Sequence, residues 1–101
     1  MKPECTVIAQ LQVKPERRAD LLEMLNDIVI LTRQETGCIE YRLHVSNDDP
    51  NRLVFYENWK TRQDMDDHMR MPYLENFLSR RLNFLTKEPD LVILTMVSDM
   101  N

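Results

Sequence analysis

Glycine is almost absent from this chain of 101 residues, in which Gly37 is the only one. A phosphate-binding loop and a dinucleotide fingerprint each need several glycines, so the sequence excludes both. With 5 Pro and no low-complexity segment, the composition is not that of a flexible chain either. We therefore predict a single ordered domain over residues 1–101, with its core at about residues 5–97.

Cysteine is equally scarce, since Cys5 and Cys38 are the only two. Two cysteines cannot form a disulfide framework, so we expect reduced thiols and a cytoplasmic protein; a secreted protein with one bridge is the alternative. Neither a C-x-x-C nor an H-E-x-x-H motif occurs, and His44 and His68 lie far apart in the sequence. We expect no metal site and no cofactor, and no nucleophile elbow supports a Ser-His-Asp triad.

Positive charge is in deficit, because 13 Lys and Arg face 17 Asp and Glu, which gives a formal net charge of −4. The basic surface that binds nucleic acid is therefore not expected. No apolar run approaches the roughly 18 residues of a membrane span, and the first residues lack the apolar stretch of a signal peptide. We expect neither a nucleic acid nor a membrane as partner.

Hydrophobic periodicity predicts strands and helices in the order β-α-β-β-α-β. One helix starts at Pro15, and Gly37 is expected to end it with a left-handed cap. A capping box at Thr61 opens a short helix to about Met69, and Pro72 starts a further helix that ends within residues 87–90. The predicted strands cover residues 4–13, 38–45, 52–60 and 91–97, the last of them as a buried strand.

This order defines an α+β class, the ferredoxin-like fold with a four-stranded antiparallel sheet. Helices can cover only one face of such a sheet. The other face would leave Ile8, Val54, Tyr56 and one side of strand 91–97 in water, which is a large apolar area. We therefore predict a homodimer with two-fold symmetry, packed sheet against sheet.

The two central strands are expected to form a hairpin, whose register decides which side chains face the core. Matching the more apolar faces predicts four cross-strand pairs: Val45 with Leu53, Leu43 with Phe55, Tyr41 with Glu57, and Ile39 with Trp59. Glu57 would then point inward, where a carboxyl group needs a hydrogen-bond donor or a proton. A register shifted by one residue would instead turn Glu57 to solvent.

A pocket between sheet and helices would gather several polar groups around an apolar space. We interpret His68 and Glu57 as candidate catalytic residues, because an imidazole moves protons near neutral pH. The candidate residues for binding a small apolar or aromatic substrate are Tyr41, Trp59, Phe55 and Tyr73. The structural alternatives are that Tyr41 and Trp59 are core aromatics and that His68 lies on the surface of a charged helix.

Three segments resemble the antibiotic biosynthesis monooxygenase (ABM) domain family. Residues 35–43 (ETGCIEYRL) resemble its E-x-G-C-x-x-Y stretch, and residues 49–59 (DPNRLVFYENW) are similar to its second signature. Residues 68–73 (HMRMPY) are similar to its H-x-x-x-P-H/Y helix start. The resemblance covers roughly residues 5–97 and implies a dimeric α+β barrel.

Members of that family include quinol and anthrone monooxygenases that use dioxygen without flavin, haem or metal. Others degrade haem or isomerise a phosphorylated signalling molecule, so the family does not fix the substrate. The haem-degrading members resemble this chain less, because Ile8, Ala9 and Gln10 stand where their first strand carries an Asn.

The resemblance therefore implies a cofactor-independent monooxygenase that oxidises an electron-rich, quinol-like or anthrone-like aromatic with dioxygen. Two alternatives are kept. One is an isomerase of a small polar metabolite, phosphorylated or not, which would need cations at the pocket; Arg42, Arg52 and Arg62 lie at strand ends or on the wrong face. The other is a non-catalytic dimeric binding module with a filled interior.

Overall fold

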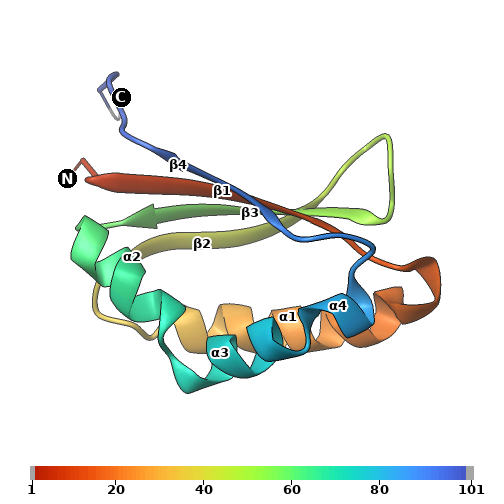
Figure 1. Cartoon of the computed structure of the whole chain (residues 1–101). Helices are drawn as coiled ribbons and strands as arrows, with labels where there is room; N and C mark the ends of the chain where they lie inside the picture. The colour runs from red at the N-terminus through yellow and green to blue at the C-terminus, as the bar shows by residue number, and fades with distance from the viewer. Residues whose placement is uncertain (1, 100–101) are drawn as a thin grey trace.

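The computed structural model describes residues 2–99, and its elements follow the predicted order. The chain runs through β1 (Cys5–Gln12), the 3-10 turn η1 (Pro15–Arg17), α1 (Arg18–Thr32), β2 (Cys38–Val45), β3 (Arg52–Trp59), α2 (Arg62–Met69), α3 (Pro72–Ser79), α4 (Arg81–Phe84) and β4 (Asp90–Leu94). All strand pairs are antiparallel, in the order β2-β3-β1-β4. Figure 1 shows the helices gathered on one side of this sheet. The predicted ferredoxin-like α+β fold is therefore confirmed.

The core lies between the sheet and the helices. Alternate residues of β1, such as Val7 and Leu11, point toward the helices and are buried, as the period of two predicted. The buried stripe of α1 includes Leu21, Leu25 and Ile28, three of the residues with helical spacing.

The hairpin register agrees with three of the four predicted pairs: Val45 with Leu53, Leu43 with Phe55, and Tyr41 with Glu57. The fourth pair is wrong, because a β-bulge between Cys38 and Glu40 shifts the register and places Cys38 opposite Trp59. Ile39 is the extra residue of that bulge. The inward direction of Glu57 depends on the pairs beyond the bulge and is unaffected.

Gly37 is not a left-handed helix cap, since no residue among 2–99 has a positive φ. Its role is to allow a close approach between the α1–β2 turn and α2. A Cβ atom at this position would lie 2.1 Å from Cγ of Asp64. Asp64 lies in the first turn of α2, whose start at Thr61 is capped as predicted: Thr61 Oγ1 accepts a hydrogen bond from the backbone N–H of Asp64 at 3.0 Å.

The single long helix predicted after Pro72 is wrong. The helix breaks at Arg80, where φ is −114° and ψ is 8°, into α3 and the short α4. Leu85 is already extended and pairs with Val13 in an isolated β-bridge, so tertiary pairing ends the helix before residues 87–90. Within residues 2–99, no helix has the length and apolar character to cross a membrane.

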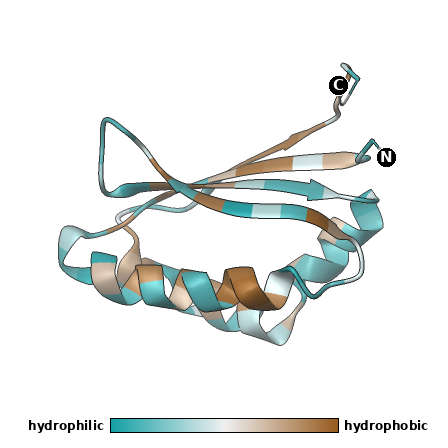
Figure 2. Cartoon of the chain, turned by 180° about the vertical axis from the view of Figure 1, so that it is seen from behind, coloured by the Kyte–Doolittle hydropathy of each residue, from teal (hydrophilic) through white to brown (hydrophobic). Residues whose placement is uncertain are grey.

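The prediction of a buried last strand is also wrong. β4 ends at Leu94, and its residues Leu91 to Leu94 are 40–47% exposed. The cause is its place at the edge of the sheet, where it is bonded only to β1. Figure 2 shows hydrophobic residues along this strand, seen from behind the view of Figure 1.

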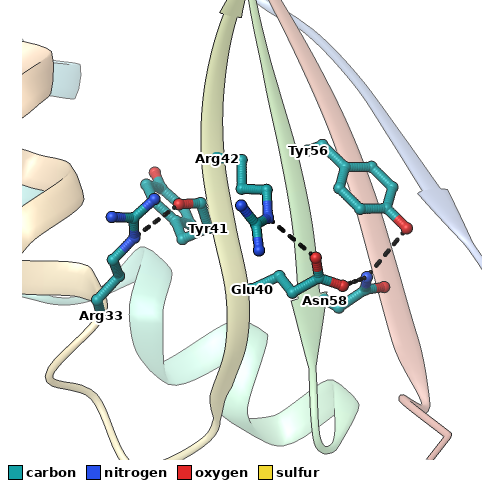
Figure 3. Close-up of polar contacts among 6 residues, drawn as sticks. All are labelled: Arg33, Glu40, Tyr41, Arg42, Tyr56 and Asn58. Atoms are coloured by element: carbon teal, nitrogen blue, oxygen red, sulfur yellow. Dashed lines mark hydrogen bonds and ion pairs between the residues drawn. The ribbon is translucent and has the colours of Figure 1, made fainter.

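The sheet face turned away from the helices carries a polar network beside its apolar residues (Figure 3). Asn58 lies at its centre and is fully buried. Its side chain accepts a hydrogen bond from Thr6 Oγ1 at 2.5 Å and donates to Glu40 Oε1 at 2.8 Å and to the Tyr56 hydroxyl at 3.0 Å. Arg42 Nε in turn donates to Glu40 Oε2 at 3.0 Å. These polar side chains therefore find their hydrogen-bond partners within the same chain.

Candidate active site

An apolar cavity lies between the sheet and the helices α2 and α3. It leaves about 60 Å³ for the centres of water-sized molecules, which is room for several waters. The flexible side chains of Met65 and Met69 form part of its wall, so the cavity can adapt to a larger occupant. We call it the apolar cavity, lined by Val7, Ala9, Leu11, Tyr41, Phe55, Glu57, Met65, His68, Met69, Leu74, Phe77, Leu78, Pro89 and Leu91.

Glu57 is the carboxyl group of this cavity. The register of β3 with β1 and β2 turns it inward between Val7 and Tyr41, and it is only 5% exposed. The Trp59 indole Nε1–H donates a hydrogen bond to Glu57 Oε1 at 3.0 Å. Burial outweighs that bond and raises the pKa of Glu57 to about 7, so both protonation states are populated near neutral pH.

His68 is the imidazole of the same cavity. It lies in the last turn of α2, is 1% exposed, and packs against the rings of Trp59 (centroids 4.7 Å apart) and Tyr41 (5.2 Å). Its Nδ1 lies 2.9 Å from Oε2 of Glu35. Burial lowers the pKa of His68, although the Glu35 carboxylate acts in the opposite direction. In a neutral ring that donates from Nδ1, Nε2 is the basic nitrogen.

Glu35 is a residue of this site that was not predicted from the sequence. It stands in the turn between α1 and β2, and its Oε2 also accepts a hydrogen bond from the Tyr73 hydroxyl. Glu35 occurs in the first family-like segment, but its partners lie 33 and 38 residues away. The only sequence signal was its fixed spacing to Gly37 and Tyr41 in that segment.

The structure brings four of the six predicted site residues to the wall of the apolar cavity: His68, Glu57, Tyr41 and Phe55. Trp59 lies behind this wall, where it holds Glu57 and packs on His68. Tyr73 lines a second cavity instead, next to Glu35. The hydrogen bond to the His68 ring comes from Glu35 and not from Glu57.

The remaining polar candidates lie away from this chemistry. Burial raises the pKa of the Cys38 thiol to about 11 and also raises that of Cys5, so neither is an activated thiolate. Among the described residues that line the apolar cavity, none is Lys or Arg. In the part of the chain described, 2–99, no three His, Cys, Asp or Glu side chains group as metal ligands.

A ferredoxin-like sheet with an apolar cavity under its helical layer, holding a buried imidazole and a buried carboxyl group, defines a class of small α+β pocket proteins. Within that class, the chain belongs to the family described as antibiotic biosynthesis monooxygenase, whose sequence profile matches residues 5–80.

Known relatives agree with this assignment. Rv0793 of Mycobacterium tuberculosis is 28% identical over 99 residues, which are 98% of this chain and 97% of that protein; YcnE of Bacillus subtilis is 29% identical, covering 83% and 88%. Both are named "putative monooxygenase". The structure of Rv0793 superposes with a TM-score of 0.90 over 96% of this chain and 98% of that one. A further relative is the uncharacterized protein sll1783 of Synechocystis, which is 26% identical over 86% of this chain. The match covers only 59% of the length of that protein.

Proposed function

We propose that the protein is a cofactor-independent monooxygenase that oxidises an electron-rich dihydroxy aromatic compound with dioxygen. The observation that carries this proposal is that His68 and Glu57 line one apolar cavity. Such a substrate reduces dioxygen by itself once a phenolic proton is removed, so the protein needs a base, a dry space and a donor for the resulting anion.

Each requirement has a candidate residue. His68 Nε2 takes the phenolic proton, and the protonated fraction of Glu57 donates a hydrogen bond to the phenolate oxygen. Tyr41 and Phe55 contact the aromatic ring. The phenolate gives electrons to dioxygen, a carbon–oxygen bond forms, and the O–O bond then breaks. One oxygen atom stays on the ring, and the other leaves as water with two hydrogens from the substrate.

The two alternatives have less support. An isomerase of a phosphorylated metabolite needs cations near the substrate, and within residues 2–99 the lining of the apolar cavity includes none. A non-catalytic module has no use for a carboxyl group that is 5% exposed and borders empty space.

The test uses menadiol, a reduced naphthoquinol, with ¹⁸O₂ and a metal chelator present, and an anaerobic control. We expect one ¹⁸O atom in the hydroxyquinone product, whereas uncatalysed oxidation yields the quinone and hydrogen peroxide. His68→Gln should lower the rate about 100-fold, because general bases contribute on that scale. His44→Gln, at an exposed position of β2, is the matched control. Oxygen uptake no faster than without protein would refute the proposal for naphthoquinols.

We also propose that the protein works as a homodimer. The support is the apolar area of the uncovered sheet face, which includes Ile8, Val54 and Tyr56 together with the exposed Val92 and Leu94 of β4. A second copy packed sheet to sheet would remove this area from water.

A further inference from the structure

Two cavities meet at the pair formed by His68 and Glu35. His68 lines the apolar cavity, whereas Glu35 and Tyr73 line a second one, here called the outer cavity. The outer cavity is larger, at about 460 Å³ on the same measure, and its rim includes the exposed residues Gln34, Thr36 and Asp67. The hydrogen bond of 2.9 Å between His68 and Glu35 therefore joins the apolar cavity to a cavity with a solvent-exposed rim.

We propose that Glu35 is a positioning and proton-relay residue, which carries protons between His68 in the apolar cavity and water in the outer cavity. The inference rests on the proposed function for its use in catalysis. The proton link itself is a property of the folded chain that can be measured without any substrate.

The transfer is balanced at every atom. The phenolic proton of the substrate moves to Nε2 of His68, the Nδ1 proton moves to Glu35 Oε2, and the Glu35 carboxyl group releases it to water. The ring stays uncharged and changes its tautomer. When the O–O bond breaks, the Nε2 proton goes to the departing oxygen, and Nδ1 regains a proton from water through Glu35. One proton leaves and one returns in each turnover, which restores His68 and matches a reaction whose by-product is water.

The surroundings explain why a relay is needed. An imidazolium ion is unfavourable at a site that is 1% exposed among apolar and aromatic groups, and burial lowers the pKa of His68 accordingly. Passing the Nδ1 proton on keeps the ring neutral. The Tyr73 hydroxyl donates to the same oxygen and so holds the carboxylate toward His68.

Other ionisable groups face this pair and enter any pH profile. Those around His68 are Glu35, Tyr41 and Glu57; those around Glu35 are Cys38 of β2, Asp64 and Asp67 of α2, and Tyr73 of α3. Asp67 provides the matched control. It lines the same outer cavity, is exposed, and accepts a hydrogen bond from Gln63.

The first experiment needs no substrate. Solvent exchange of the His68 Nδ1 proton is measured by ¹⁵N-resolved NMR in the wild type, Glu35→Gln and Asp67→Asn. A Gln oxygen can accept the bond from Nδ1–H but cannot carry the proton away. We expect solvent exchange of this proton to be at least about tenfold slower in Glu35→Gln, because that variant lacks the general base. The rate should be unchanged in Asp67→Asn. Equal rates in the wild type and Glu35→Gln would overturn the inference.

The second experiment uses menadiol turnover. Glu35→Ala should lower kcat with little change in KM, and added acetate, which reaches the vacated position from the outer cavity, should restore part of the rate in a saturable manner. A merely structural role would give no rescue, and that result counts against the relay. If the wild type does not oxidise menadiol but the exchange difference is found, the proposed function fails for this substrate and the proton link stands.

Discussion

At the scale of single residues, Glu57 shows that a useful chemical group opposes stability. Its carboxyl group accepts a hydrogen bond from Trp59 but is buried, and burial raises its pKa from the ordinary 4.5 to about 7. A raised pKa of an acid means that the folded state binds the proton more tightly than the unfolded state. Protonation of Glu57 therefore contributes its full stabilisation to the folded state below pH 4.5. This contribution is lost as the pH rises to about 7.

The first prediction follows from that sign. Because one pKa unit corresponds to about 1.4 kcal/mol, ionisation of Glu57 should lower the free energy of unfolding by about 3 kcal/mol between pH 4.5 and pH 8. In Glu57→Gln this loss disappears, so the difference in unfolding free energy between variant and wild type should move in favour of the variant across this range. Urea unfolding at several pH values and one protein concentration measures it.

The control is Glu23→Gln, at an exposed position of α1. It removes a carboxyl group that is not buried. His68 contributes with the opposite sign, because its pKa is lowered, but it is present in every protein compared. A pH-independent difference for Glu57→Gln would mean that Glu57 is ionised at little cost.

Residue-scale prediction from sequence succeeded where one local rule decided the outcome. Alternation along β3 placed Glu57 and Phe55 inward, and the same rule placed Tyr41. It failed for Glu35, because a polar residue in a turn has no periodicity to mark its direction. Its partners His68 and Tyr73 come from helices whose packing against the turn the sequence does not specify.

At the scale of elements, the α1–β2 turn packs closely against the first turn of α2, the helix that carries His68. Gly37 provides the space, since an added Cβ would lie 2.1 Å from Cγ and 2.4 Å from Cβ of Asp64. The prediction that this glycine ends the helix is wrong, because α1 already ends at Thr32 and Gly37 lies in the turn before β2. The reason for a glycine here is a side chain that lies 27 positions further along the chain, beyond the reach of local turn rules.

The second prediction tests this contact. Gly37→Ala should destabilise the protein by about 2 kcal/mol, as overpacking does elsewhere. The same change should cost much less in an Asp64→Gly background, where the clashing atoms are gone. A double-mutant cycle by urea unfolding isolates the coupling from the cap that Asp64→Gly also removes. Equal costs in both backgrounds would show that the clash is relieved in another way.

At the scale of the whole molecule, the sheet is covered on one side only. The sequence predicted this imbalance, because two helices cannot cover both faces of four strands. The sequence did not predict how polar and apolar side chains are distributed over the uncovered face. Asn58 and its partners form hydrogen bonds with one another there, whereas β4 leaves apolar side chains exposed. A partner that packs over Asn58 and Thr6 would therefore not leave these two buried side chains unpaired.

The last prediction concerns this face. Val92 is 47% exposed and pairs with Ile8, so in a sheet-to-sheet dimer Val92→Glu would bury a carboxylate in an apolar contact. We expect light scattering to give twice the 12.1 kDa chain mass for the wild type and a single chain mass for Val92→Glu at micromolar concentration. Leu82→Glu adds the same charge at a residue of α4 that is 50% exposed on the helical layer, and it should remain a dimer. A wild-type monomer, or dissociation by both variants alike, would contradict the proposed interface.

Because Leu91 of the same strand lines the apolar cavity, Val92→Glu should also weaken menadiol turnover while Leu82→Glu does not, which links assembly to the site.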